Sequence, residues 1–310
     1  MRRPRRPLAV LAALFGVACS LNVGEHGGPC GEDAHTGTVP QQLVFVSDAV
    51  FGQYDICLIN TNGTAATQLT TSLSDDWWPS WSPDGSKIVF MTNRNLTPGD
   101  TIPAHPQYDL YVINVDGSGE TRITTDTTNE AQPAWSPLGN RIAFVSDRDG
   151  NNEIYLMNPD GGAVTRLTND AASDEQPAWS PDGTKVVFVS FRTGNAEIFV
   201  MDTTGANLVN LTNNGAADFV PAWSPDGTKI AFHSNRAGNF AVFVMNADGS
   251  NVVQLTNAAV PDELPAWSPD GTHLIFDTDG ELWIMTAAGA GATQVTHSRF
   301  VHDFMARWRP

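Results

Sequence analysis

The stretch Gln176 to Asn195, QPAWSPDGTKVVFVSFRTGN, decides the fold, because the chain repeats nearly the same sequence several times. The triplet Trp-x-Pro marks six repeats, at Trp81, Trp135, Trp179, Trp223, Trp267 and Trp308. Successive copies from Trp135 to Trp267 are 44 residues apart. A repeat of about 44 residues with several short strands per unit is typical of the four-stranded blade of a β-propeller, and not of a helical solenoid.

Each unit contains the same series of short strands. A phenylalanine stands nine residues after each of the first five tryptophans, and Phe45 takes this place in the unit before them. These phenylalanines lie in apolar runs rich in β-branched residues, such as Lys185 to Ser190, which indicate a buried strand. A second aromatic run, such as Glu197 to Asp202, indicates the next strand, and a short strand ending in Leu-Thr follows it. Turns of the Ser-Pro-Asp-Gly type separate the strands.

The two ends of the repeat region together complete one unit. The first unit, from Leu43 to Thr70, has three strands but no Trp-x-Pro strand before them, and the stretch Phe304 to Pro310, FMARWRP, supplies it. The sequence therefore predicts an all-β fold over residues 42–310. We expect a six-bladed β-propeller of four-stranded antiparallel blades whose ring is closed by the C-terminal strand, which leaves no open sheet edge.

The first twenty residues have the pattern of a secretion signal. Four arginines precede an apolar run from Leu8 to Val17 that is too short to span a bilayer. We expect residues 1–19 to be a signal peptide and residues 20–41 a flexible tether. Cys19 stands where a bacterial lipoprotein is cleaved and acylated, and cleavage without lipid is the alternative. The protein is therefore expected to be exported, periplasmic or on the cell surface.

The chain has three cysteines. Cys57 occupies the position at which the other units have an aromatic residue in the same strand. In an oxidising compartment Cys30 and Cys57 can form a disulfide that fixes the tether to the first blade, which leaves Cys19 for a lipid. Two buried thiols are the alternative.

The composition excludes several classes of function. A net charge of −17 argues against binding of nucleic acid or of anionic membrane surfaces, and favours cations or basic partners. The sequence has no Gly-x-Ser-x-Gly elbow and no phosphate-binding glycine loop after a strand, and its seven histidines do not recur in the repeat. We therefore expect a monomer that is not an enzyme and requires no cofactor.

The repeat resembles that of a known family. The stretch Gln132 to Asn158 follows the pattern P-A-W-S-P-D-G-x-K-I-A-F-x-S-x-R-x-G-N-x-E-I-Y-x-M-N, with Leu138 where Asp is usual. This pattern resembles the propeller repeat of TolB, the periplasmic component of the Tol-Pal system, and the resemblance covers Leu43 to Pro310, without the N-terminal domain of TolB. It implies a six-bladed propeller that interacts with envelope proteins and can hold a cation in its channel. Similar repeats also occur in propellers fused to serine peptidase domains and in some polysaccharide lyases.

An acidic residue stands five positions before each Trp-x-Pro tryptophan, at Asp76, Glu130, Asp174, Asp218, Asp262 and Asp303. Because these positions begin the innermost strands, we expect a ring of carboxylates near one mouth of the channel. Such a ring suits a hard cation such as Ca²⁺. The alternative is structural ion pairing with four arginines that stand thirteen residues after four of the tryptophans, Arg94, Arg148, Arg192 and Arg236.

The last two units lack such an arginine, which leaves Asp262 and Asp303 unmatched. The same region contains Glu263, Asp277, Asp279, Glu281 and His302. We expect a cation, a basic peptide or an envelope protein to dock there. The loop from Asn95 to Gln107 is either a further contact surface or a tolerated insertion. The predicted function is a protein or peptide interaction scaffold, and a carbohydrate-binding or polysaccharide-cleaving propeller is the alternative.

Overall fold

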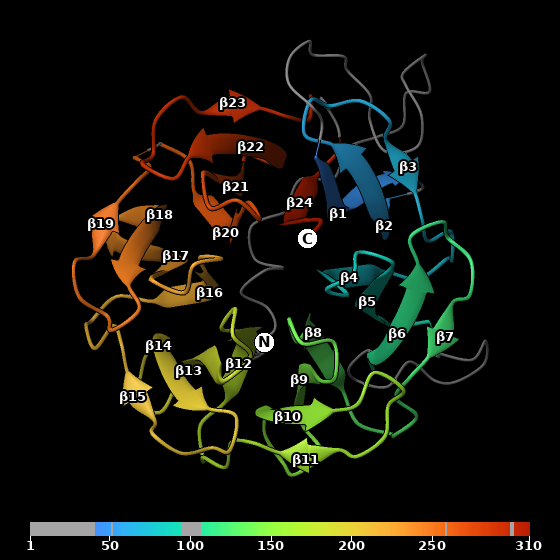
Figure 1. Cartoon of the computed structure of the whole chain (residues 1–310), viewed down its shortest axis with the longest axis horizontal. Helices are drawn as coiled ribbons and strands as arrows, with labels where there is room; N and C mark the ends of the chain where they lie inside the picture. Colours follow the sequence, from blue (N-terminus) through green and yellow to red (C-terminus); the bar gives the residue numbers. More distant parts are fainter. Residues whose placement is uncertain (1–40, 51, 95–106, 258, 298–300) are drawn as a thin grey trace, which may run out of the picture.

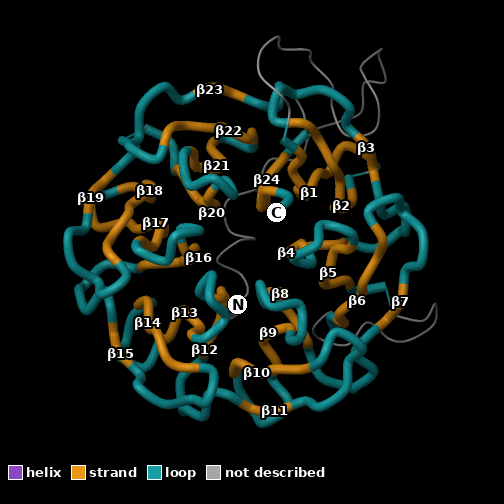
Figure 2. Tube along the Cα trace, in the orientation of Figure 1, coloured by secondary structure: helices purple, strands orange, loops and turns teal. Residues whose placement is uncertain are grey.

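Twenty-four strands form six four-stranded antiparallel sheets in the computed structural model, which describes residues 41–50, 52–94, 107–257, 259–297 and 301–310. The sheets surround a central channel as the blades of a disc (Figure 1). The tube in Figure 2 shows strands and loops only, and the described part of the chain contains no helix that could cross a membrane. The predicted six-bladed propeller is confirmed.

The strands follow one another in the same order in every blade. The first blade contains β24 (Asp303–Trp308), β1 (Gln42–Val50), β2 (Gln53–Asn60) and β3 (Thr67–Gln68). The second and third contain β4 (Asp76–Trp81), β5 (Lys87–Thr92), β6 (Asp109–Asn114), β7 (Thr121–Arg122), β8 (Glu130–Trp135), β9 (Ile142–Ser146), β10 (Glu153–Met157) and β11 (Thr165–Arg166). The fourth to sixth contain β12 (Asp174–Trp179), β13 (Lys185–Ser190), β14 (Glu197–Asp202), β15 (Val209–Asn210), β16 (Asp218–Trp223), β17 (Lys229–Ala237), β18 (Asn239–Asn246), β19 (Val253–Gln254), β20 (Asp262–Trp267), β21 (His273–Thr278), β22 (Glu281–Thr286) and β23 (Thr293–Gln294).

The C-terminal strand closes the ring as the sequence predicts. β24 pairs antiparallel with β1, and Trp308 lies opposite Leu43 while Asp303 lies opposite Ser47. The backbone N–H of Arg309 also donates a 2.9 Å hydrogen bond to the carbonyl of Gln42. The first blade is therefore built from both ends of the repeat region.

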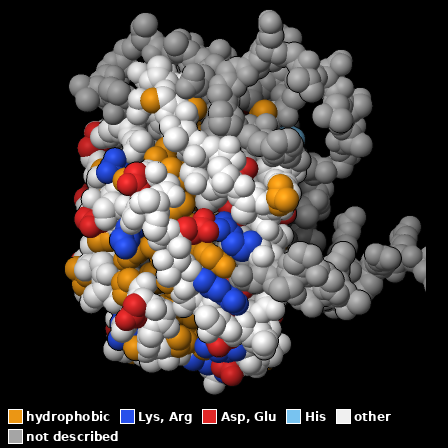
Figure 3. Space-filling view, turned by 90° about the vertical axis from the view of Figure 1, so that its right-hand side faces the viewer, with side chains coloured by type: hydrophobic (Ala, Val, Ile, Leu, Met, Phe, Trp, Pro, Cys, Tyr) orange, Lys and Arg blue, Asp and Glu red, His pale blue; other side chains and the backbone are white. Residues whose placement is uncertain are grey.

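The repeated phenylalanines form the centre of each blade. Phe45, Phe90, Phe144, Phe188 and Phe232 are 0% exposed and Phe276 is 4% exposed. In four blades the phenylalanine contacts an aromatic ring of the next strand, with ring centroids 5.8 to 6.1 Å apart. Burial of such rings contributes about 2 kcal/mol each, so one well-filled position per repeat stabilises every blade. From the edge of the disc, charged side chains of both signs are scattered between apolar ones (Figure 3).

Cys57 lies opposite Phe45, in the position where the other blades have an aromatic residue. The side chain is 1% exposed and is disulfide-bonded. Cys19 and Cys30, like the predicted signal peptide and tether, lie outside the described residues. Lipid attachment at Cys19, the Cys30–Cys57 pairing and the boundaries at residues 19 and 41 therefore stay predictions.

Candidate functional site: the central channel and its two mouths

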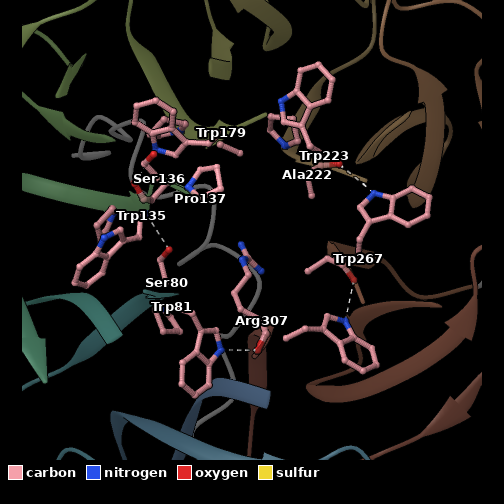
Figure 4. A pocket seen from close by; sticks show the side chains of 18 of the residues that line it. Ser80, Trp81, Trp135, Ser136, Pro137, Trp179, Ala222, Trp223, Trp267 and Arg307 are labelled. Atoms are coloured by element: carbon pink, nitrogen blue, oxygen red, sulfur yellow. Dashed lines mark hydrogen bonds between the residues drawn. The ribbon is translucent and has the colours of Figure 1, made fainter. Parts of the chain in front are cut away.

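Six innermost strands surround the channel, β4, β8, β12, β16, β20 and β24, and each runs from an acidic residue to a tryptophan. A cavity of about 370 Å³ lies at the tryptophan end. Figure 4 shows this cavity with the tryptophans around it and Arg307 reaching toward its centre. Its walls are mainly tryptophan, proline and alanine side chains. We call this end the tryptophan mouth and the opposite end the acidic mouth.

The tryptophans join neighbouring blades. In four of them the indole N–H donates to a backbone carbonyl on the innermost strand of the preceding blade: Trp81 to Arg307 (3.1 Å), Trp179 to Ala134 (3.0 Å), Trp267 to Ala222 (3.1 Å) and Trp308 to Ala266 (3.2 Å). The indole nitrogen of Trp223 is buried without a hydrogen-bond partner. The sequence identified these residues as strand markers, but their role as links between blades depends on the ring geometry.

A β-bulge interrupts every innermost strand two residues after its acid. The bulge residues are not glycines, yet all have positive φ between 49° and 57°: Trp78, Gln132, Gln176, Val220, Leu264 and Met305. An extra residue in a bulge turns the following side chains relative to the sheet. All of these residues except Leu264 line the cavity.

Hydrogen bonds at the bulges also link neighbouring blades. The amide oxygen of Gln132 accepts the backbone N–H of Gln176, and that of Gln176 accepts the N–H of Val220, both at 2.8 Å. Nδ1 of His233 accepts the N–H of Leu264 at 3.1 Å. Burial lowers the pKa of His233 to about 3, so the ring is neutral and accepts this bond. His233 is thus a buried residue that links two blades.

The six acids of the predicted ring lie at the other end of these strands. Each is buried in its own blade, with an exposure of 0 to 2%. Four of them pair with the predicted arginine of the same blade: Asp76 with Arg94 (2.9 Å), Glu130 with Arg148 (3.2 Å), Asp174 with Arg192 (2.8 Å) and Asp218 with Arg236 (2.8 Å). Each arginine also lies over two aromatic rings of its blade, 4.7 to 5.9 Å from their centroids.

These contacts favour the structural alternative to a carboxylate ring, and binding of calcium at the six acids stays a prediction. The bulge separates the acids from the side chains that reach the channel, and an ion pair within each blade already compensates four of the charges. Within the described ranges, no three His, Cys, Asp or Glu side chains are placed to hold a metal ion together. The structural alternative, ion pairing, holds in these four blades.

The sixth blade and the closing strand have no such arginine. In the sixth blade the hairpin between β21 and β22 is a two-residue Asp279-Gly280 turn, in which both residues have positive φ, 53° and 77°. Asp-Gly is a preferred sequence for this turn because the second residue accepts positive φ without steric cost. The shorter loop leaves no position for an arginine in the sixth blade. Within the described residues, neither Asp262 nor Asp303 makes a salt bridge.

Several buried carboxyl groups lie where the sixth blade meets the closing strand, and positive charges do not fully compensate them. Both carboxylate oxygens of Asp303 are buried without a hydrogen-bond partner among the described residues, although the nearby hydroxyls of Ser47 and Thr296 partly offset the rise of its pKa. Burial raises the pKa of Asp303 to about 7. Burial, and then the charge of Asp262, raise the pKa of Glu263 to about 7. Burial also raises the pKa of Asp277 well above its usual value, and Glu263 adds to this shift.

The seven residues expected to bind a partner fall into three groups by exposure. Asp262 and Asp303 are 2% and 0% exposed, so neither can contact a partner directly. Asp279 is exposed in its turn. The other four are partly exposed: Glu263, Asp277, Glu281 and His302. His302 already pairs with Asp48 at 2.8 Å, and Glu281 accepts a 2.6 Å hydrogen bond from Thr296. The loop at 95–106 lies outside the described residues.

Asp303→Asn is expected to change how stability depends on pH. The raised pKa means that the folded protein keeps this proton up to about pH 7, whereas an unfolded Asp loses it near pH 4. The folded state is therefore progressively destabilised relative to the Asn variant as pH rises from about 4 to 7. The difference in free energy of unfolding should grow over this range by on the order of 2 to 4 kcal/mol, because each pKa unit is worth about 1.4 kcal/mol.

Urea unfolding at pH 4.5, 6 and 7.5 measures this difference. Asp279→Asn is the matched control, because Asp279 is exposed and Asn also accepts positive φ. Parallel pH curves for wild type and Asp303→Asn would show that Asp303 ionises freely in the folded protein.

Comparison with known proteins agrees with this geometry. A TolB beta propeller domain family matches residues 170–306, and a Tricorn protease N-terminal beta propeller domain family matches residues 97–191. The chain is 32% identical over 144 residues to a protein named TolB homolog from Chlorobium luteolum, covering 36% of this chain and 33% of that protein. The crystal structure of TolB from Acinetobacter baumannii superposes with a TM-score of 0.73 at 25% identity, over 87% of this chain and 67% of that chain.

The chain is a TolB-like β-propeller. An uncharacterized protein of Agrobacterium fabrum, Atu1656, is also 33% identical over 113 residues, covering 36% of this chain and 35% of that protein. The TolB-like propeller thus spans about a third of the length of these curated relatives.

Two features of the TolB-like propeller were missed in the sequence. The bulge glutamines escaped notice because only three of the six repeats have a polar or aromatic residue there: Trp78, Gln132 and Gln176. Arg307 could have been found, because it stands where the other five innermost strands have Ser80, Ala134, Ala178, Ala222 and Ala266. A charged residue at a position otherwise reserved for small ones is a signal that comparison of the repeats can reveal.

Proposed function

We propose that this TolB-like propeller is an exported, lipid-anchored scaffold that binds a basic protein segment at the cell envelope. Likeness to TolB supports an interaction role in the envelope. The four arginines and the apolar run within residues 1–20 support export, and Cys19 supports a lipid anchor. A non-catalytic role is favoured because the acids of four blades are held in ion pairs with their own arginines.

One observation carries the proposed docking position. The acidic mouth is neutralised by an arginine in four blades, but not in the sixth blade or at the closing strand. The exposed carboxylate of Asp279 and the partly exposed Glu281 stand at this edge, next to the buried Asp262 and Asp303. In a protein of net charge −17, an edge with an excess of carboxylates attracts Lys- and Arg-rich segments.

Binding of an envelope partner to the full chain tests the proposal. We expect an envelope extract to yield a partner whose basic segment, made as a peptide, binds the purified protein. The double variant Asp279→Asn/Glu281→Gln should weaken this binding about tenfold and reduce its dependence on salt. Asp160→Asn/Asp248→Asn is the control, because it removes two exposed charges from the turns at the tryptophan mouth.

Other outcomes would contradict the proposal in identifiable ways. Unchanged affinity of the Asp279→Asn/Glu281→Gln variant would exclude this edge as the docking position. Release of unsaturated products from an acidic polysaccharide would favour the carbohydrate alternative. In cells, Cys19→Ser should move the protein from the membrane to the soluble fraction, and retention at the membrane would contradict the lipid anchor.

A further inference from the structure

The lining of the cavity at the tryptophan mouth has a charge opposite to the net charge of the protein. Although the chain carries a net charge of −17, the described residues that line the 370 Å³ cavity include no Asp and no Glu. Arg307 is the charged side chain in this lining. The lining of the cavity therefore carries a positive charge in an acidic protein.

The guanidinium group of Arg307 is not used in a structural ion pair. Within the described part of the chain, no carboxylate lies within the 4 Å that defines a salt bridge to it, and its Nη1 donates to the neighbouring carbonyl of Ala306 at 2.9 Å. Asp277 acts on it only at longer range. Burial lowers the pKa of Arg307 to about 10, so the group still carries its charge at neutral pH. Figure 4 shows it reaching into the space between the tryptophans.

Other polar side chains of the cavity present donors as well. The amide oxygens of Gln132 and Gln176 each accept a backbone N–H of the next blade, so the NH₂ group of each side chain is the end left for the cavity. The hydroxyl oxygen of Ser80 accepts the backbone N–H of Trp135 at 3.0 Å, which leaves its hydrogen to donate. The polar groups of this wall thus favour a ligand that accepts hydrogen bonds.

We infer that the tryptophan mouth binds a carboxylate carried by a short apolar peptide segment, with Arg307 as the anchor. A planar guanidinium binds a carboxylate through two parallel hydrogen bonds, and two glutamine amides add donors. The tryptophan and proline walls suit apolar flanking residues, and the cavity volume lies in the usual range for a small ligand. A sugar fits less well, because the described lining has no carboxylate to accept its hydroxyl donors and the amide oxygens of Gln132 and Gln176 already accept hydrogen bonds.

This site is separate from the proposed docking edge, which lies at the acidic mouth and prefers the opposite charge. The two mouths are the two ends of the same innermost strands, so each can be tested without changing the other. Failure of one proposal therefore leaves the other intact.

Calorimetric titration of the full chain with two matched peptides tests the inference. We expect acetyl-Ala-Leu-Glu-Leu-Ala-amide to bind and its Gln counterpart to bind at least about tenfold more weakly. Arg307→Gln should weaken binding of the Glu peptide at least about tenfold and remove the preference for Glu over Gln, whereas Arg307→Lys should retain part of it. Arg141→Gln is the control, because it removes one positive charge beside a loop at the same mouth.

Thermal melting shows whether each variant is folded. If Arg307→Gln does not fold, the binding of Arg307→Lys still tests the inference. Equal affinities for the Glu and Gln peptides, or unchanged binding by a folded Arg307→Gln variant, would overturn the inference. Absence of binding of the Glu peptide up to about 10 mM would also overturn it, since even one charge-assisted contact of a few kcal/mol should be detectable. Binding of tri-galacturonate without binding of the Glu peptide would assign the site to an acidic sugar instead.

Discussion

Deletion of residues 303–310 is expected to prevent the propeller from folding cooperatively. The deletion removes β24, the innermost strand of the first blade, and with it the buried side chains of Phe304, Met305 and Ala306. Burial of the two larger ones alone contributes about 4 kcal/mol, and the backbone pairing with β1 is lost as well. Since the whole stability of a domain is only about 5 to 15 kcal/mol, this loss is severe.

The closing strand also joins both of its neighbours. The indole of Trp308 donates to Ala266 in the sixth blade, and the carbonyl of Arg307 accepts the indole of Trp81 in the second blade. Without β24, the edge of β1 is unpaired, and open strand edges promote aggregation. We expect the truncated chain to lose its sharp thermal transition in circular dichroism and to elute as aggregates in size-exclusion chromatography.

A deletion of Pro310 alone is the control, because it leaves every residue of β24 in place. A synthetic peptide of residues 301–310, added to the truncated chain, should restore a cooperative transition if the missing strand is the cause. A truncated chain that melts at the same temperature as the full chain would contradict closure by β24.

Arg192→Met is expected to destabilise the fourth blade by about 3 kcal/mol at pH 8. Removal of one partner of a buried ion pair leaves the other charge uncompensated, which costs about 3 to 5 kcal/mol. Asp174 is fully buried and accepts two hydrogen bonds from Arg192, at 2.8 and 3.0 Å. Arg192 also lies 5.0 Å from the centroid of Phe199 and donates to Ser190 at 2.7 Å, so its position is fixed on several sides.

A double-mutant cycle separates the ion pair from these other contacts. The cycle compares Arg192→Met, Asp174→Asn and the double variant Asp174→Asn/Arg192→Met by urea unfolding. The double variant should lose about 1 to 3 kcal/mol less free energy of unfolding than the sum of the two single variants, and this difference is the coupling energy of the pair. Arg141→Gln should change stability by less than about 0.5 kcal/mol, because within the described residues its side chain makes a single 3.4 Å hydrogen bond at the surface, to the carbonyl of Ala163. Strictly additive single effects would mean that the pair is not a coupled unit.

The repeat predicted the architecture well because it records packing directly. Each blade needs one large ring at its centre, so Phe45 and its equivalents recur at one position and are fully or nearly fully buried. The missing strand before Phe45 and the extra one at Trp308 then predicted the closure that the β1–β24 pairing confirms. The arginines also recur at a fixed spacing from the acids, which correctly indicated the four ion pairs.

The channel could not be predicted in the same way. Asp174 and its equivalents were placed at one mouth of the channel because they begin the innermost strands, and side chains alternate between the two faces of a regular strand. The bulge at Gln176 breaks the alternation, and nothing in the sequence indicates it, because residues other than glycine seldom have positive φ. The donors of the tryptophan mouth follow from the hydrogen bonds that these bulges make, so they became visible only in three dimensions.

The pairing of β24 with β1 has a consequence for the order of the blades along the chain. Arg309 and Gln42 are hydrogen-bonded neighbours in space, although 267 positions separate them in sequence. A short linker could therefore join these positions, and new ends could be opened at an exposed turn such as Asp160-Gly161. Circularly permuted chains of this kind would start with a different blade and still form the same disc.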